Sequence, residues 1–187
     1  MTPDEIVSHA KTKFSQALVH FQDELKKVRT GRAHPSMLDG LMVEAYGTPM
    51  PLLQVGQVSA PEPQLLQITP FDPNNIQAIA TAIRNNPSLD MNPMDDGKVV
   101  RVPIPPLNEE RRREYVKVVG SKAEDCMISL RNARHEAMSG IDQAKKDKNI
   151  GEDDAKRLSK QVDDALNQTK AEIDSLSKAK EQEILTV

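Results

Sequence analysis

Apolar side chains recur at helical spacing near the start of the chain. Between residues 3 and 29 they follow one another at intervals of three and four, which places them on one face of a helix. Thr2 and Glu5 have the spacing of a capping box, with Pro3 in the first turn, and Gly31 is typical of a helix end. The apolar positions of this predicted helix are Ile6, Ala10, Phe14, Ala17, Phe21, Leu25 and Val28.

Two longer stretches after residue 106 show the same kind of period. Asn108 is a candidate cap for the first of them, with Glu109 and Glu110 placed to oppose the helix dipole. Residues 149–151 form a tight connection, so the second and third helices are predicted to pack antiparallel and, with the first, to make an elongated three-helix bundle. Their apolar seams are Val119, Ala123, Cys126, Leu130, Ala133, Ala137, Ile141 and Ala144, and Ala155, Leu158, Val162, Ala165, Thr169, Ile173, Leu176, Ala179 and either Glu183 or Ile184.

The middle of the chain loses this period. Twelve of the thirteen prolines lie between Pro35 and Pro106, and proline costs roughly 3 kcal/mol in a helix interior, so long helices are excluded there. The pattern predicts strands at 41–46, 52–58, 65–69 and 98–102, a short helix over 76–83, and turns at 70–74 and 95–97. The predicted fold is therefore α+β, with a bundle of residues 1–30 and 106–187 and an inserted β/α/β domain of residues 31–105.

Two short joints connect the inserted domain to the bundle. One crossing contains Gly31, which is conformationally permissive, and the other contains three prolines, which restrict the backbone. Two chain segments between the inserted domain and the bundle restrain twisting of the domain but allow it to swing. We therefore expect a two-stranded hinge. The expected hinge residues are Thr30, Gly31, Arg32, Val102, Pro103, Ile104, Pro105 and Pro106.

Composition narrows the class of protein. The mean hydropathy is −0.56, and no apolar run approaches the roughly 20 residues that cross a bilayer. The acidic start of the chain does not resemble a signal peptide, and a single cysteine suits a reducing cytosol. We therefore expect a soluble, cytoplasmic protein with no membrane partner. We also expect the protein to be a monomer.

The sequence offers no catalytic constellation. The four histidines are scattered without metal-ligand spacing, and no glycine-rich phosphate loop is present. The carboxylates at 95–96 fall in a predicted turn, and those at 152–154 are an ordinary acidic helix start. We expect no catalytic residue, metal site or cofactor, and the sequence therefore argues against an enzyme.

Basic residues form a stripe beside the seam of the second helix. Lys117, Arg131 and Arg134 belong to it, and Arg111, Arg112 and Arg113 add charge at the same end. The pattern leaves two interpretations open, a solvated helix face and a surface that contacts nucleic acid. The arginines slightly favour contact with nucleic acid, because the planar guanidinium group can bind two phosphate oxygens at once.

Several blocks of the sequence, spread in order over the whole chain, resemble the ribosome recycling factor family. The blocks are Val28-Arg29-Thr30-Gly31-Arg32-Ala33-His34-Pro35 with Leu38-Asp39-Gly40, Tyr46-Gly47-Thr48-Pro49-Met50-Pro51-Leu52, the run from Arg101 to Arg112, Arg131-Asn132-Ala133-Arg134, and Lys180-Glu181-Gln182-Glu183-Ile184-Leu185. His135 departs from the family, which usually has a second arginine there, and the 85–93 loop is one residue longer than usual.

The resemblance implies a three-helix bundle that carries a small β/α/β domain on a hinge, with an L-shaped outline like transfer RNA. It implies binding to the post-termination ribosome and, with elongation factor G and GTP hydrolysis by that factor, separation of the subunits. The bundle would contact large-subunit ribosomal RNA at the subunit interface, and the inserted domain and hinge would face elongation factor G. The candidate RNA-binding residues are Arg112, Arg131, Arg134, Lys117, Arg29 and Arg32.

A second class of function is a structural adaptor, in which the bundle binds helices of another protein and never meets RNA. Such an adaptor would expose apolar side chains at the positions that flank the seams. Those positions are largely charged or small here, which counts against this alternative.

Overall fold

The computed structural model describes residues 1–87, 89 and 91–186. The chain forms two compact units, one of residues 1–28 and 112–186 and the other of residues 29–111. The α+β class, with a helical bundle and a smaller inserted unit, is therefore confirmed. The expected domain boundaries at 30/31 and 105/106 stay a prediction, because compactness alone does not show where each part folds independently.

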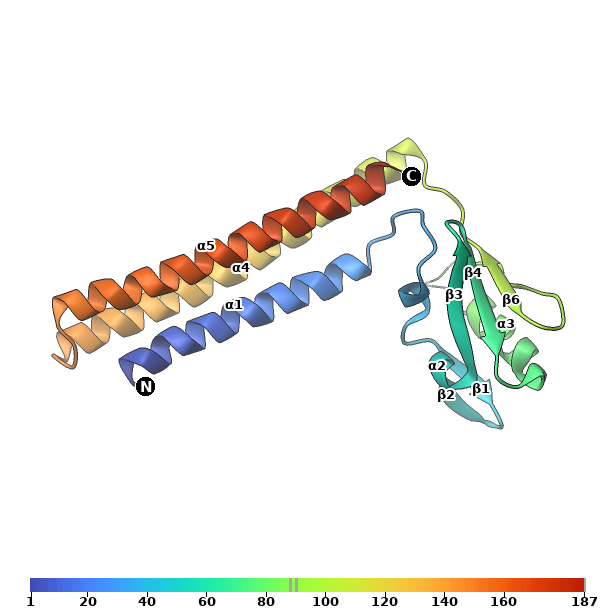
Figure 1. The fold of residues 1–187 in the computed structure, drawn as a ribbon, viewed down its shortest axis with the longest axis horizontal. Coiled ribbons are helices and arrows are strands. Elements are labelled where there is room, and N and C mark those ends of the chain that lie inside the picture. The colour runs from blue at the N-terminus through green and yellow to red at the C-terminus, as the bar shows by residue number, and fades with distance from the viewer. Residues whose placement is uncertain (88, 90, 187) are drawn as a thin grey trace. The chain divides into compact units, whose positions relative to one another are not determined.

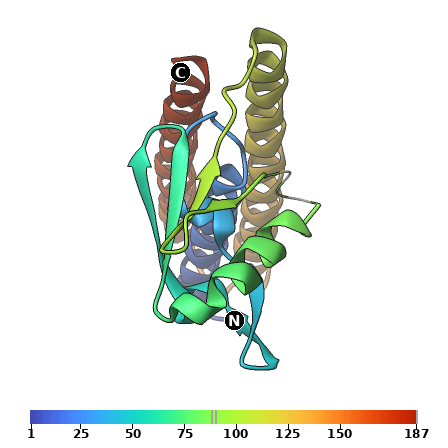
Figure 2. The ribbon, with the colours of Figure 1, turned by 90° about the vertical axis from the view of Figure 1, so that its right-hand side faces the viewer.

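Three long helices make up the first unit, as predicted, although the first ends at Lys26 and not near Gly31. They are α1 (Pro3–Lys26), α4 (Glu109–Lys146) and α5 (Glu152–Leu185), and they run side by side in both views (Figures 1 and 2). The 38 residues of α4 correspond to a length of roughly 57 Å at 1.5 Å per residue. The capping box at the start of α1 is present, since Thr2 Oγ1 accepts from the Glu5 amide and Glu5 Oε2 from the Thr2 amide.

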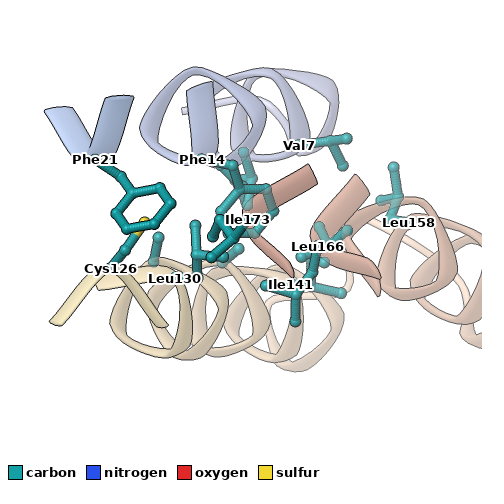
Figure 3. Close-up of a cluster of buried hydrophobic side chains, with 14 of the residues drawn as sticks. Val7, Phe14, Phe21, Cys126, Leu130, Ile141, Leu158, Leu166 and Ile173 are labelled. Atoms are coloured by element: carbon teal, nitrogen blue, oxygen red, sulfur yellow. The ribbon is translucent and has the colours of Figure 1, made fainter. Parts of the chain in front are cut away.

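The bundle core consists of the predicted seams, and Figure 3 shows side chains from all three helices meeting there. Phe14 of α1, Leu130 of α4 and Ile173 of α5 are at most 1% exposed. The seam of α5 was predicted wrongly at two positions, because Leu166 is buried and Ala179 is exposed. Two successive steps of three residues after Ile173 rotate position 179 about 120° off the stripe, whereas Leu166 stays on it.

The second unit combines a hairpin with a four-stranded antiparallel sheet. The hairpin pairs β1 (Met42–Ala45) with β2 (Thr48–Pro51). The sheet has the order β3-β4-β6-β5, and α3 (Ile76–Arg84) contacts β1, β5 and β6 and lies on one side of the sheet (Figure 2). The sheet strands are β3 (Gly56–Glu62), β4 (Leu65–Pro70), β5 (Met94–Asp95) and β6 (Val100–Pro103), and 3-10 turns span Pro35–Leu38 and Pro73–Asn75.

The strand expected over 52–58 is wrong in its first half. Residues Leu52–Val55 form a short helix, α2, and the strand begins at Gly56. Leu52 and Val55 are both buried at a spacing of three, and Leu53 and Gln54 between them are exposed, which is one helical turn. The strand at 48–51 was missed because its two prolines are typical of a turn, yet edge strands tolerate proline.

Most of the remaining predictions for the inserted unit are confirmed. The strand expected over 98–102 begins only at Val100, and Asp95, expected in a turn, belongs to the two-residue strand β5, which was not predicted. Strands occupy 65–70 and 100–103, and α3 buries Ile76, Ile79, Ala80 and Ile83 against them. Two residues of the 85–93 loop, Ser88 and Asp90, lie outside the described residues. Within the described part of the chain, none of the helices combines the length and apolar character needed to cross a membrane.

Glu24 links α1 to α4 through Lys122 and also contacts Lys27 at the end of its own helix. Its carboxylate accepts from Lys122 Nζ of α4 at 2.5 Å and from Lys27 Nζ at 2.8 Å. The hydrogen bond from Lys122, followed by that from Lys27, lowers the pKa of Glu24 from 4.5 to about 2. The ionised carboxylate is therefore favoured in the folded bundle.

This shift predicts a pH-dependent contribution to stability. Because the folded-state pKa lies below the ordinary value, Glu24 stabilises the fold above about pH 4.5, and this contribution disappears as the pH falls through about 2. In urea unfolding followed by circular dichroism, we expect Glu24→Gln to be less stable than the parent at neutral pH. The two should converge toward pH 2.

The matched control is Glu172→Gln, at an exposed carboxylate on α5. We expect its stability to follow that of the parent at every pH. A Glu24→Gln deficit that stays constant from neutral pH to pH 2 would contradict an electrostatic role for the Glu24–Lys122 contact.

Candidate nucleic-acid interface

The basic stripe of α4 lies beside its buried face. Val119, Leu130 and Ala137 point into the bundle and are at most 4% exposed. At 3.6 residues per turn, an arc of roughly 100° around the helix axis, to one side of these buried residues, holds Lys117, Arg131 and Arg134. Lys117 and Arg131 are exposed and Arg134 is half-buried, so the structure brings these three candidates to one face.

Arg134 is oriented by an acidic residue of α5. Its Nε donates to Asp163 Oδ1 at 2.6 Å, and its Nη2 to Asp163 Oδ2 at 3.5 Å. This contact raises the pKa of Arg134, so the guanidinium is permanently charged. Both side chains are more than 40% exposed, and such a pair contributes about 0–1 kcal/mol. Its Nη1 has no acceptor within the described residues, so this nitrogen remains available to an outside acceptor.

Arg131 is paired more loosely. Its Nη1 donates to Glu124 Oε1 at 2.9 Å on the same helix, and the two side chains are 60% and 57% exposed. An exposed pair of this kind is screened by salt and costs little to break. The Arg131 guanidinium can therefore exchange the Glu124 carboxylate for a phosphate oxygen.

Arg112 differs from the other arginines of α4. It is half-buried, and its Nε is buried without a hydrogen-bond partner in the part of the chain that the structure describes. An unpaired buried donor costs about 1–3 kcal/mol, so rotation of this side chain toward an external acceptor would be favourable. Arg112 therefore contributes a donor at the N-terminal end of α4, apart from the arc that holds Lys117, Arg131 and Arg134.

Arg29 and Arg32 belong to the other unit. Arg29 Nη2 donates to the carbonyl of Leu89, whereas Arg32 is exposed. Gly31 between them has φ +81°, in the left-handed region where glycine is favoured. These residues follow α1 and lie in the first joint.

Both joints are tied to one turn of the inserted unit. The Ala33 amide donates to the Pro63 carbonyl at 2.7 Å, and the Ile104 amide to the Gln64 carbonyl at 2.8 Å. Pro63 and Gln64 form the turn between β3 and β4. Of the expected hinge residues, Val102 and Pro103 lie within β6 and pair with β4, so they are held by the sheet. Thr30 and Ile104 are buried, and Pro105 and Pro106 are exposed.

Sequence reasoning missed the acidic partners of the arginines. Asp163 could have been found from the antiparallel register, because the short connection at 147–151 places residue 134 of α4 opposite residues near 163 of α5. Glu124, which pairs with Arg131, lies on the same helix seven residues earlier. The described residues contain no cluster of three or more histidine, cysteine or acidic side chains able to hold a metal ion.

Comparison with protein families gives a specific match. Residues 21–185 match the family model for ribosome recycling factor. The ribosome-recycling factor of Streptomyces coelicolor is 41% identical over 184 residues, covering 98% of this chain and 99% of the relative. The ribosome-recycling factor of Corynebacterium jeikeium has the same identity and coverage.

Solved structures give the same result. A solution structure of the ribosome recycling factor matches with a TM-score of 0.81 and 34% identity, covering 99% of this chain and 98% of the other. Models for the T. thermophilus ribosome recycling factor and the E. coli elongation factor G bound to the E. coli post-termination complex match with a TM-score of 0.68 and 36% identity, covering 99% of this chain and all of the other. Sequence and fold agree along the whole length, and the chain belongs to the ribosome recycling factor family.

Proposed function

We propose that this protein binds the post-termination ribosome and, with elongation factor G and GTP hydrolysis by that factor, splits it into subunits and releases mRNA and tRNA. The observation that carries the proposal is the exposed cationic arc of α4, in a chain that is similar over its full length to recycling factors. One of these similar proteins is described together with elongation factor G on a post-termination complex. The protein would act in the cytoplasm as a monomer, without a catalytic group, metal or cofactor of its own.

The bundle would bind the large-subunit ribosomal RNA at the subunit interface. Arg131 and Arg134 would exchange or share their carboxylate partners with phosphate oxygens, and Lys117 and Arg112 would add charge along α4. Each phosphate contact releases condensed counterions, so the affinity would fall steeply with salt. Arg29 and Arg32 would contribute near the first joint.

The joints would let the inserted unit move. Residues 33 and 104 are anchored to the same β3–β4 turn, and residues 102 and 103 are held in β6. A swing would therefore be absorbed by Thr30 and Gly31 in one crossing and by Pro105 and Pro106 in the other. Elongation factor G would push on the inserted unit, and the long helices would transmit the force.

The test is light scattering of post-termination ribosomes with this protein, elongation factor G and GTP. We expect a GTP-dependent fall in scattering as the subunits separate. Arg131→Ala and Arg134→Ala should each weaken ribosome binding and reduce the slope of log affinity against log salt by about 1, the contribution of one phosphate contact.

Asp163→Asn is the matched control for Arg134→Ala. It breaks the same ion pair but keeps the arginine, so it should bind ribosomes with at least the parental salt slope. The anchoring proposal fails if both arginine variants bind with unchanged affinity and slope. A fall in scattering that does not require GTP, or no fall at all, would contradict the proposed function.

Gly31 provides a test of the hinge. Gly31→Ala places a Cβ on a backbone with φ +81° and restricts the joint, so splitting should fall more than ribosome binding. Gly97→Ala is matched to it, with φ +83° in a turn of the same unit and open space around the added Cβ. We expect Gly97→Ala to split ribosomes at the parental rate. Equal loss of binding and splitting in Gly31→Ala would argue against a hinge.

A further inference from the structure

A carboxylate lies in the middle of the arc of α4. Glu124 follows Lys117 by seven residues and precedes Arg131 by seven, and seven residues turn the helix about 20° short of two full turns. The three side chains therefore lie in one column along the helix, with the acid between the two bases, and all three are exposed. A negative charge at this place repels phosphates from the surface that the neighbouring cations offer to them.

The contact between Glu124 and Arg131 spans about two turns of the helix. Arg131 Nη1 donates to Glu124 Oε1 at 2.9 Å, whereas oppositely charged side chains on one helix usually meet at a spacing of three or four. Residues seven apart are separated by about 10.5 Å along the axis, so both side chains must extend toward each other. None of the residues three or four positions from Arg131 is acidic; they are Met127, Ile128, Arg134 and His135. Within the described residues, the carboxylate that Arg131 contacts is that of Glu124.

Glu124 and a phosphate compete for the same guanidinium. A phosphate that arrives at Arg131 must either replace the carboxylate or lie beside it. Replacement loses the ion pair, and coexistence brings two negative charges close together. The affinity for a phosphate surface is therefore lower than it would be with an uncharged side chain at position 124. Because the two extended side chains lose rotamer freedom when they pair, the pair opens readily and does not prevent binding.

Asp163 holds Arg134 from a different place. Asp163 belongs to α5, is half-buried, and accepts from Arg134 Nε at 2.6 Å at the edge of the arc. A phosphate can approach Arg134 from the exposed side while Asp163 keeps the guanidinium in position. Asp163 therefore orients an arginine from beside the arc, whereas Glu124 occupies an arginine from within it.

We propose that Glu124 is a competitor built into the phosphate-binding surface, which lowers the affinity of the arc for RNA and speeds the release of the protein. The proposal rests on the proposed function, because a protein that splits ribosomes repeatedly must leave one large subunit before it can act on the next. The arginines supply the binding, and Glu124 limits how long that binding lasts.

The test measures the binding of labelled protein to isolated large ribosomal subunits, and its release after unlabelled protein is added. We expect Glu124→Gln to bind about three- to fivefold more tightly than the parent, the most that one exposed ion pair contributes, with most of the gain in slower release. The gain should shrink at high salt, which screens exposed charges. Unchanged affinity in Glu124→Gln would overturn the proposal.

The matched control is Asp125→Asn, which removes the same charge from the next residue. Asp125 is exposed but lies about 100° around the helix from Glu124. We expect this variant to bind and leave the subunits as the parent does, because a screened charge on another face contributes little. A gain equal to that of Glu124→Gln would reduce the effect to net charge and would overturn the proposal.

A double-mutant cycle tests whether Glu124 acts through Arg131. With Arg131→Ala the carboxylate has no guanidinium to occupy, so adding Glu124→Gln should raise the affinity by at most about 1.5-fold. The full gain should persist with Lys117→Ala, because Lys117 is equally far from Glu124 in sequence but is not paired with it within the described residues. Equal gains with and without Arg131 would show general repulsion of RNA and would overturn competition for this arginine.

Splitting assays separate this proposal from the proposed function. When the protein is in excess over ribosomes, Glu124→Gln should split them as the parent does. When the protein is limiting, repeated rounds should slow by about the same factor as release, because the protein must leave before it acts again. A parental rate over repeated rounds would overturn the role in release. Tighter binding by Glu124→Gln without any splitting, by variant or parent, would contradict the proposed function and leave the competition by Glu124 standing.

Discussion

The structure depends on the packing of α1 against α4 and α5, because that contact closes the bundle across an insertion. Residues 29–111 separate α1 from the rest of the first unit, so its side chains reach their partners only after a long loop has closed. Closing a loop of this length costs on the order of 4 kcal/mol if it is flexible. Each fully buried phenylalanine or leucine of α1 contributes about 1.5–3 kcal/mol, so Phe14, Phe21 and Leu25 together exceed that cost. The insertion folds into a unit that holds both joints at the β3–β4 turn. Because the two ends of the loop are thereby kept near each other, the entropic cost of closing it is lower still.

The same packing decides which surface of α4 is left for a partner. α1 contacts one side of α4, where Lys122 meets Glu24 and the Cys126 thiol donates to the Ala17 carbonyl. α5 lies on the other side, where Asp163 holds Arg134. The arc begins at Arg134, which contacts α5, and continues through Arg131 and Lys117 onto the exposed surface of α4. The arginines are pre-oriented by carboxylates that are themselves exposed, which keeps the cost of exchanging a carboxylate for a phosphate small.

The long helices and the stripe could be predicted because both depend on local periodicity. The seams of α1 and α4 follow directly from apolar spacing, and the positions of Arg131 and Arg134 follow from the same count. The Arg134–Asp163 contact depends on the register between two helices, which no single-helix pattern contains. The strand predicted at Leu52–Val55 was wrong for a different reason. The pattern of residues 52–55, between Pro51 and Gly56, fits one helical turn and a short strand equally well. Only the burial of Leu52 and Val55 against their neighbours decides between the two.

The distribution of lysine and arginine differs between the two units. The arc on α4 concentrates lysine and arginine side chains on one face, and residues 33–83 of the insertion contain neither residue type. A phosphate-rich surface would therefore bind the bundle and repel this part of the insertion, so RNA contact would hold one unit while leaving most of the other unattached. Because the chain crosses between the units twice, a force applied to the insertion would reach the helices through Gly31 in one crossing and through the prolines at 105 and 106 in the other.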